Sequence, residues 1–536
     1  IFMKKLLALL LAAAMTMSFA ACGSSSSSEE GAAAEGGQEA SGETADSGEE
    51  ITFIVRETGD PKSFNPDIMA DDNAYVAVQN MFNRLVKLDA SKQVIPDAAE
   101  TWEFSEDGLT LTFHLRQDLT WSDGEKLTSE DVKYTFDTIK ANPTYHMNSY
   151  LTDVTSIEAP DDYTVVFNLA QPDVSIVANL GWYACFILPE HVYNNGQSWD
   201  ENPASMNPVT SGPFKFESYT QGERTVLVAN EDYYNPPKID RLILSIIPDE
   251  ATAVQALING ELDYYTTIPT ANVAELEADP NISLALNEYP SPYRFIFNTK
   301  DEIMQDEAVR RAFAHCINRE EISEKVYNNV MPPEYNFYPS MIEWASNSED
   351  TVPKFDLEAA EKCLIDAGYT KNANGYYIEG VTIDAFEAAS CPDLAKLVVA
   401  NLDKVGIKAE VIVSEYNAWN DKVGIQRDFC VELQGGFMGP DPNALYMRFG
   451  TGTASNYGDW SNAEFDAICA EARATSDQAA RGELYKQAQK IMSEELPYVP
   501  VVAFGAYDAY SARFKNLPND GAGKWGWNEF TYTELA

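Results

Sequence analysis

Within residues 107–124, DGLTLTFHLRQDLTWSDG, apolar and polar side chains alternate strictly from Leu109 to Arg116. A period of two sends successive side chains to opposite faces of a β-strand, so this segment predicts a strand that is buried on one face. The turn residues Ser105-Glu106-Asp107-Gly108 separate it from the WEF segment, which favours a β-hairpin over residues 101–116. The predicted apolar face consists of Leu109, Leu111, Phe113 and Leu115.

The period of the pattern changes directly after this hairpin. Apolar residues recur at helical spacing over residues 129–139 behind Thr128, and Asp131 stands three residues after that threonine. This spacing is typical of a capped helix start. A second hairpin is expected over residues 154–169, where two apolar runs flank a Pro-Asp-Asp turn. Together these segments predict a compact α+β unit.

Further along the chain, strand and helix patterns alternate without a fixed repeat. An apolar strand over residues 241–249 precedes a helix that Gly260 ends, and a strand follows. Residues 306–327 are expected to form one long helix, and residues 393–413 predict a helix followed by a strand. Such an order builds mixed α/β sheets. Because 536 residues exceed what one core usually supports, we expect an α/β protein of two or three domains.

The N-terminal segment has the pattern of a secretory signal. Two lysines precede a short apolar run that ends in Phe-Ala-Ala-Cys at Cys22. Small residues directly before a cysteine suit lipoprotein signal peptidase, so we expect residues 1–22 to be a signal peptide and Cys22 to carry the lipid. The alternative is an ordinary signal peptide with an incidental cysteine. Residues 23–50 are rich in Gly, Ala, Ser and Glu, which predicts a disordered acidic tether before ordered structure begins near Ile51.

The formal net charge of −47 excludes most nucleic-acid and anionic-membrane partners, because phosphate groups would be repelled. Solubility of a secreted protein explains such a charge, and an acidic patch for a cationic ligand is the alternative. No CxxC motif occurs, and we expect buried free thiols rather than disulfides, although fifteen disulfide pairings are open. The six cysteines concerned are Cys185, Cys316, Cys363, Cys391, Cys430 and Cys469.

Catalytic and metal-binding motifs are missing from the sequence. It contains no GxSxG, HExxH, Walker or GxGxxG motif, and its four histidines lack metal-ligand spacing. We therefore expect no enzymatic activity, no cofactor and no metal site. A surface enzyme would need a convergent nucleophile and base, and turnover by the purified protein would reveal one.

Residues 98–136, AAETWEFSEDGLTLTFHLRQDLTWSDGEKLTSEDVKYTF, closely resemble a signature of bacterial extracellular solute-binding proteins of the oligopeptide, dipeptide and nickel class. Further similar segments follow in the family's order along nearly all of residues 51–536. They are TSGPFKFESY from Thr210, ANEDYY from Ala229, LINGELD from Leu257, VRRAFAHCINRE from Val309, EAAEKCLIDAGY from Glu358 and ELPYVPVV from Glu495.

This resemblance implies an α/β fold like that of periplasmic binding proteins, with two lobes joined by a hinge and an inserted α+β domain that is scaffold. The lobes would close over a ligand and dock on the permease of an ABC importer. The protein would act as a monomer outside the cytoplasmic membrane, held there by the lipid on Cys22. The implied boundaries are 51–88 with 210–290 and 500–536 for the first lobe, 89–209 for the inserted domain and 291–499 for the second lobe.

The resemblance also implies where a ligand binds. Extended peptides in this class use main-chain hydrogen bonds and roomy side-chain pockets. Matching positions in this chain are Asn73, Ala74 and Tyr75 in NAYV, Tyr293 in PYRFIFN, Tyr416 in SEYNAW, and Gly436, Phe437 and Met438 in QGGFMG. Each of these residues could instead belong to an ordinary core or loop.

The glycine-rich loop departs from the peptide-binding pattern. Peptide-binding relatives usually carry an acid a few positions later, which holds the peptide ammonium by a charge-assisted bond. Here the loop is shortened, and Asp441 is the only acid available, although an Asp in a Pro-flanked turn has a structural role just as readily. Oligopeptides or dipeptides are therefore the expected ligand, with a nickel chelate or an oligosaccharide as alternatives. A non-transport role as a peptide receptor or adhesin would use the same body.

Overall fold

The computed structural model describes residues 50–68, 71–89, 93–145, 147–182, 185–387, 390–436, 438–518 and 529–536. The predicted signal peptide, the lipid site Cys22, the predicted tether up to residue 49, and Phe437 in the glycine-rich loop lie outside these ranges.

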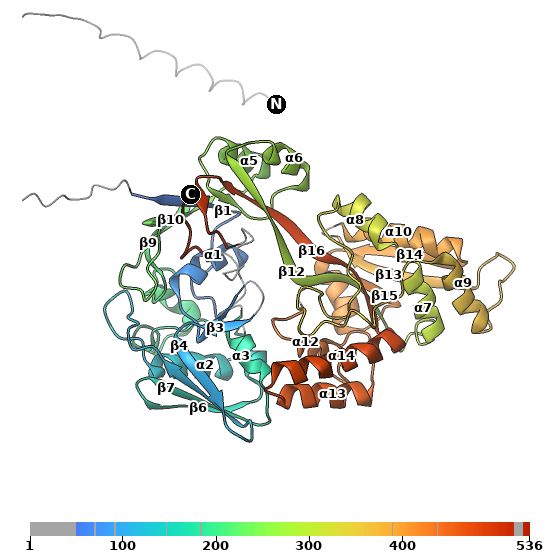
Figure 1. The fold of residues 1–536 in the computed structure, drawn as a ribbon, viewed down its shortest axis with the longest axis horizontal. Helices are drawn as coiled ribbons and strands as arrows, with labels where there is room; N and C mark the ends of the chain where they lie inside the picture. Colours follow the sequence, from blue (N-terminus) through green and yellow to red (C-terminus); the bar gives the residue numbers. More distant parts are fainter. Residues whose placement is uncertain are drawn as a thin grey trace, which may run out of the picture. The chain divides into compact units, whose positions relative to one another are not determined.

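Ten strands form the main sheet. They are β1 (Thr52–Glu57), β8 (Phe214–Thr220), β9 (Arg224–Ala229), β10 (Arg241–Ile246), β11 (Tyr264–Tyr265), β12 (Ile282–Phe297), β13 (Ile378–Phe386), β14 (Ile407–Ser414), β15 (Val431–Gln434) and β16 (Tyr498–Ser511). Their order across the sheet is β14-β13-β15-β12-β16-β11-β1-β10-β9-β8 (Figure 1).

The two longest strands, β12 and β16, join two hydrophobic cores. They pair antiparallel from Ile282 opposite Ser511 to Ile296 opposite Tyr498, with an irregularity near Tyr293, and Figure 1 shows them side by side. We call the core that includes Phe53, Val55, Phe113 and Phe136 the first core. The second core includes Phe295, Phe313, Ile383 and Tyr498. A smaller cluster packs helix α5 (Glu250–Ile258) and its neighbours against the sheet.

A separate four-stranded sheet confirms both predicted hairpins. Its elements are β4 (Ala99–Phe104), β5 (Thr110–Leu115), β6 (Val154–Asp161), β7 (Thr164–Leu169) and the covering helix α2 (Ser129–Ala141), with strand order β4-β5-β7-β6. The predicted cap is present, because the Thr128 backbone N–H donates to Asp131 Oδ2 at 2.8 Å. Leu111, Phe113 and Leu115 are buried, whereas Leu109 precedes the strand and is exposed.

The prediction of a single helix over residues 306–327 is wrong. The structure has two helices, α7 (Glu307–His315) and α8 (Arg319–Tyr327). The break has a local cause, because the Asn318 side chain accepts a hydrogen bond from the Glu321 backbone N–H at 3.2 Å and so begins a new helix.

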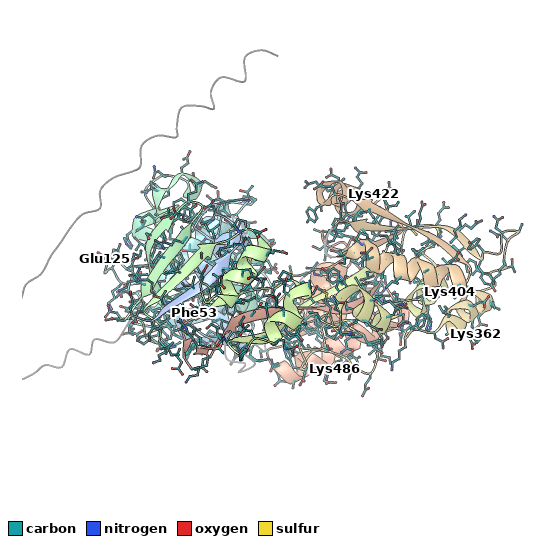
Figure 2. The ribbon with its side chains drawn as sticks, turned by 90° about the horizontal axis from the view of Figure 1, so that it is seen from above. Phe53, Glu125, Lys362, Lys404, Lys422 and Lys486 are labelled. Carbon is teal, nitrogen blue, oxygen red and sulfur yellow. The ribbon has the colours of Figure 1, made fainter. Side chains whose placement is uncertain are left out.

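Four helices surround the second core: α9 (Leu357–Asp366), α10 (Cys391–Lys404), α13 (Ala463–Ala474) and α14 (Gln478–Glu495). In Figure 1, α13 and α14 lie side by side. Figure 2 labels Lys362 and Lys404, which are exposed on α9 and α10, and Phe53, whose ring is buried in the first core. All six cysteines expected to be free are free thiols. No helix within the described ranges is long and apolar enough to cross a membrane.

The remaining elements complete the fold. The helices are α1 (Asp72–Met81), α3 (Ser175–Leu180), α4 (Glu190–Tyr193), α5 (Glu250–Ile258), α6 (Val273–Glu277), α11 (Tyr416–Trp419) and α12 (Ala444–Phe449). The strands are β2 (Val86–Leu88), β3 (Val94–Pro96), β17 (Phe514–Lys515) and β18 (Glu534–Leu535). Single helical turns are η1 (Asn148–Leu151), η2 (Trp199–Glu201), η3 (Pro203–Ser205), η4 (Thr270–Asn272) and η5 (Asn420–Ile425).

Candidate functional site

Three parallel strands of the second core, β14, β13 and β15, end at one edge of the main sheet. Strand β13 pairs in parallel with both β14 and β15. Because parallel strands bring their carboxyl ends together, the segments that follow Phe386, Ser414 and Gln434 meet at this edge. Ligands of open α/β sheets bind just outside such carboxyl ends. We call this region the carboxyl edge, and it is the candidate binding site.

An aromatic cluster stands at the carboxyl edge, directly after β14. Tyr416 is 57% exposed, and its ring centroid lies 5.9 Å from that of Trp419 and 6.1 Å from that of Phe386. The indole N–H of Trp419 is buried without a hydrogen-bond partner among the described residues. A large exposed aromatic ring held by two others is a ready contact surface for an apolar ligand group. The predicted pocket residue Tyr416 is therefore accessible.

The glycine-rich loop follows β15 at the same edge and packs against Tyr293. A Cβ atom at Gly435 would lie 2.8 Å from the Tyr293 ring, so only glycine fits there. The Gly436 carbonyl oxygen accepts a hydrogen bond from Arg294 Nη1 at 2.8 Å, and the Met438 N–H donates to the Pro290 carbonyl at 2.8 Å. The structure thus brings the loop and Tyr293 together, although two backbone groups of the loop already have protein partners.

Tyr293 itself is part of the second core. It is only 5% exposed, and its ring stacks on that of Tyr327 with centroids 5.8 Å apart. Burial raises the pKa of the Tyr293 hydroxyl well above its ordinary value. The contact with Gly435 makes Tyr293 a support for the loop.

Asp441 has a buried partner that the sequence did not reveal. Its two carboxylate oxygens each accept a hydrogen bond at 2.6 Å from the Arg481 guanidinium, one from Nη1 and one from Nη2. Both side chains are almost fully buried. Asp441 also accepts from the Asn443 backbone N–H at 2.8 Å. This carboxylate therefore fixes a turn, and a role in holding a ligand ammonium stays a prediction.

The predicted residues of the first lobe lie on α1, beside the first core. Ala74 and Tyr75 are buried, and Asn73 is half-buried, with its Oδ1 accepting from Thr58 Oγ1 at 2.7 Å. Arg84 Nη2 donates to the Tyr75 hydroxyl at 3.4 Å. Burial raises the pKa of Tyr75 to about 12, so the hydroxyl stays protonated at physiological pH. Of these three residues, Asn73 has the most accessible side chain.

Residues that follow the carboxyl edge also contact the unit built on the four-stranded sheet. Arg473 Nη2 lies 2.7 Å from Asp153 Oδ2, and the Arg473 carbonyl accepts from the Val174 N–H at 2.9 Å. Asn443 Nδ2 donates to Ser175 Oγ at 3.2 Å. The turn that contains Asp441 is therefore held from both sides.

A cavity elsewhere in the molecule does not coincide with the carboxyl edge. It has a volume of about 460 Å³ and is lined by the polar segment 346–350 and one face of α14, including Lys486, which Figure 2 labels. None of the predicted ligand-binding residues lines it. The described part of the chain also contains no group of three or more His, Cys, Asp or Glu side chains that could hold a metal ion.

Comparison with known proteins identifies the class of molecule that carries this edge. Residues 93–457 match the family model described as bacterial extracellular solute-binding proteins, family 5 Middle. The chain belongs to this family. A family 5 protein binds solutes rather than transforming them, which agrees with the sequence prediction that this chain is not an enzyme.

Alignments with curated relatives cover most of this family 5 protein. The chain is 27% identical over 501 residues to the dipeptide-binding protein of Escherichia coli (strain K12), which covers 88% of this chain and 93% of that protein. It is 28% identical over 500 residues to heme-binding protein A of Haemophilus influenzae, with 88% and 90% covered.

A solved structure confirms the predicted fold class. The Helicobacter pylori ABC transporter-associated periplasmic binding protein DppA, in complex with the peptide STSA, superimposes with a TM-score of 0.71 and 26% identity. The superposition covers 90% of this chain and 98% of that one. The α/β fold of the binding-protein class is therefore established for this family 5 protein.

Two buried charged residues beside the carboxyl edge of this family 5 protein were not predicted from the sequence. Arg294 on β12 and Glu432 on β15 are both 0% exposed. Charged residues are almost never fully buried without a partner. An Arg in an otherwise apolar strand, PYRFIFN, was the available signal.

Proposed function

We propose that this family 5 protein captures short peptides outside the cytoplasmic membrane and delivers them to the permease of an ABC importer. The observation that carries the proposal is that exposed Tyr416 and the loop residues Gly435 and Gly436 follow parallel strands whose carboxyl ends lie at the same edge of the sheet. An extended peptide needs main-chain partners and adjustable side-chain pockets, and this edge carries both a loop backbone and an exposed aromatic surface. One relative is named for dipeptide binding, and another was solved in complex with a peptide, and both support the same ligand class.

The mode of capture is proposed to be closure of two lobes. We propose the lobes and the inserted domain with the boundaries predicted from the sequence, and the presence of two large cores joined by β12 and β16 supports a division into two lobes. The predicted ligand residues of α1 and those of the carboxyl edge would then face the peptide from opposite lobes. Closing two lobes over a solute gives the importer two distinguishable shapes.

The anchoring is proposed to be covalent. Lipid on Cys22 and the acidic tether would keep a monomeric binding body near its importer while leaving it free to reorient. Mass spectrometry of the membrane-extracted protein should give the mass of a chain that begins at a diacylated Cys22. An unmodified chain cleaved elsewhere would contradict the anchor and leave peptide capture intact.

Native mass spectrometry tests the ligand class directly. Protein purified without unfolding should carry co-purified peptides, and the Tyr416→Ala variant should retain fewer of them. Ile365→Ala serves as the matched control, because Ile365 is 54% exposed on α9, away from the carboxyl edge. Recovery of a sugar or a metal chelate would overturn peptide binding in favour of those ligands.

One observation favours a second ligand class. A relative of nearly the same identity is named for heme binding, so family 5 bodies of this kind are not restricted to peptides. A heme-like ligand would also use an exposed aromatic surface such as Tyr416. Absorbance of the purified protein in the Soret region would reveal it.

A further inference from the structure

Arg294 is a fully buried arginine that lies directly beneath the candidate ligand loop. Strand β12 places it opposite Gln434, the last residue of β15. Its Nη1 donates to the Gly436 carbonyl at 2.8 Å and to the Pro292 carbonyl at 3.3 Å. A Cβ atom at Gly436 would lie 3.5 Å from Arg294 Nη2, the nearest atom to it outside the loop. Because Gly436 has no side chain, no Cβ atom lies over that nitrogen.

The remaining donors of Arg294 have no hydrogen-bond partner in the part of the chain that the structure describes. Its Nε and Nη2 atoms are buried, and neither makes a hydrogen bond to any described residue. These two N–H groups point in parallel from one side of the guanidinium, and this fork matches the two oxygens of a carboxylate. Leaving hydrogen-bond donors without partners in a buried site costs folding free energy. Other buried arginines behave differently, since Arg319 directs its donors to the Glu334, Pro353 and Pro500 carbonyls.

Two guanidinium groups and one carboxylate interact electrostatically around this fork. Glu432 is the buried acid closest in the sheet, but its Oε1 accepts from Gln434 and its Oε2 has no hydrogen-bond partner among the described residues. No hydrogen bond within the described structure joins Glu432 to the Nε or Nη2 atom of Arg294. Burial and the Arg448 guanidinium lower the pKa of Arg294, and the Glu432 carboxylate acts in the opposite direction, whereas burial raises the pKa of Glu432. Arg448 therefore brings a second positive charge close to the fork.

We propose that Arg294 is the anchor for a carboxylate of the bound solute, which reaches the Nε and Nη2 fork over Gly436. The inference rests on the proposed function and narrows its ligand to one with a free carboxylate, such as the C-terminus of a peptide. Arg448 supplies additional positive potential, and the loop carbonyl on Nη1 fixes the guanidinium plane.

Paired peptides test the anchor. The probe is Ser-Thr-Ser-Ala as the free acid and as the C-terminal amide, titrated calorimetrically into the unfolded-and-refolded, ligand-free full chain. The wild type should bind the acid about 10- to 100-fold more tightly than the amide, as expected for a bidentate charge-assisted pair. Arg294→Gln should bring this ratio to about one, and Arg294→Lys should leave an intermediate ratio. A wild-type ratio near one, or an unchanged ratio in Arg294→Gln, would overturn the anchor.

A second arm requires no peptide. Sodium acetate should raise the melting temperature of the wild type above that in sodium chloride of equal ionic strength, and this difference should vanish in Arg294→Gln. Arg319→Lys is the matched control, because it alters a fully buried arginine away from the loop and should keep both acid preference and acetate response. If neither peptide form binds while acetate still raises the melting temperature of the wild type and not that of Arg294→Gln, the proposal of peptide capture fails and the proposal of the carboxylate anchor stands. If acetate changes the melting temperatures of the wild type and Arg294→Gln equally, the proposal of the anchor fails.

Discussion

Replacing Asp441 should destabilise the protein strongly. In Asp441→Asn the bidentate contact to Arg481 is lost and a buried guanidinium remains without its counter-charge. Removing one partner of a buried ion pair costs about 3–5 kcal/mol. For a cooperative unit of the size predicted for the second lobe, each kcal/mol lowers the melting temperature by about 2–4 °C. The expected loss is therefore roughly 6–20 °C.

Differential scanning calorimetry of ligand-free protein measures this loss. Asp366→Asn is the matched control, because its ion pair with Lys362 is 61–70% exposed and such pairs contribute at most about 1 kcal/mol. The double variant Asp441→Leu/Arg481→Met should recover most of the stability, since no buried charge is left. A melting temperature for Asp441→Asn within about 1 °C of the wild type would refute a structural role for the pair.

The same variant tests whether Asp441 holds a ligand ammonium. If it does, Asp441→Asn should weaken binding of peptides with a free amine and leave N-acetylated peptides unaffected. If Asp441 only fixes its turn, both peptide forms should lose affinity equally, because the turn also positions Asn443 against Ser175.

Three other outcomes are expected. Burial raises the pKa of Asp263 to about 6, so the folded chain binds this proton more tightly than the unfolded chain and loses stability as pH rises from about 4 to about 6. Urea titrations should show that the free energy of unfolding of Asp263→Asn changes less over this pH range than that of the wild type. An equal pH dependence in both proteins would contradict Asp263 as the source of the effect. At pH 8 a thiol reagent should label Cys363 alone among the six described cysteines of native protein, since the other five are buried, and mass spectrometry would expose any second rapid site. Arg473→Ala should increase the radius of gyration of ligand-free protein in X-ray scattering, because it removes the contact to Asp153. An unchanged radius would show that this contact does not restrain the proposed lobes.

Features with a local cause were predictable from the sequence. The hairpins and the capped helix at Thr128 depend on residues within a few positions of each other, and the structure has them. The break between α7 and α8 was missed although its signal is equally local, an Asn at position 318 followed three residues later by Glu321.

Features that depend on distant partners were not predictable. Asp441 and Arg481 lie 40 positions apart on segments with no shared motif. Arg294 reaches its place under the loop only because β12 pairs with β15, which brings it opposite Gln434. The resemblance predicted Tyr416 and the loop as ligand-facing, and that stays a prediction. The burial of Tyr293 and Tyr75 comes from packing that no periodicity in the sequence encodes.

The sheet order predicts the length of the preferred peptide. Tyr416 follows β14, Arg294 lies on β12, and the order β14-β13-β15-β12 separates these strands by three inter-strand steps. Three steps of about 4.8 Å give a span of about 14 Å, and an extended peptide advances about 3.3 Å per residue. A peptide whose carboxylate occupies the Arg294 fork therefore reaches the Tyr416 ring with about four residues.

Calorimetry with free-acid alanine peptides of two to six residues should show affinity rising up to about four residues and then levelling. In Tyr416→Ala this gain should disappear, because the distant contact is lost while the carboxylate anchor remains. A dipeptide that binds the wild type as tightly as a tetrapeptide would show that the ligand does not cross the carboxyl edge, and the two anchors would then belong to separate subsites.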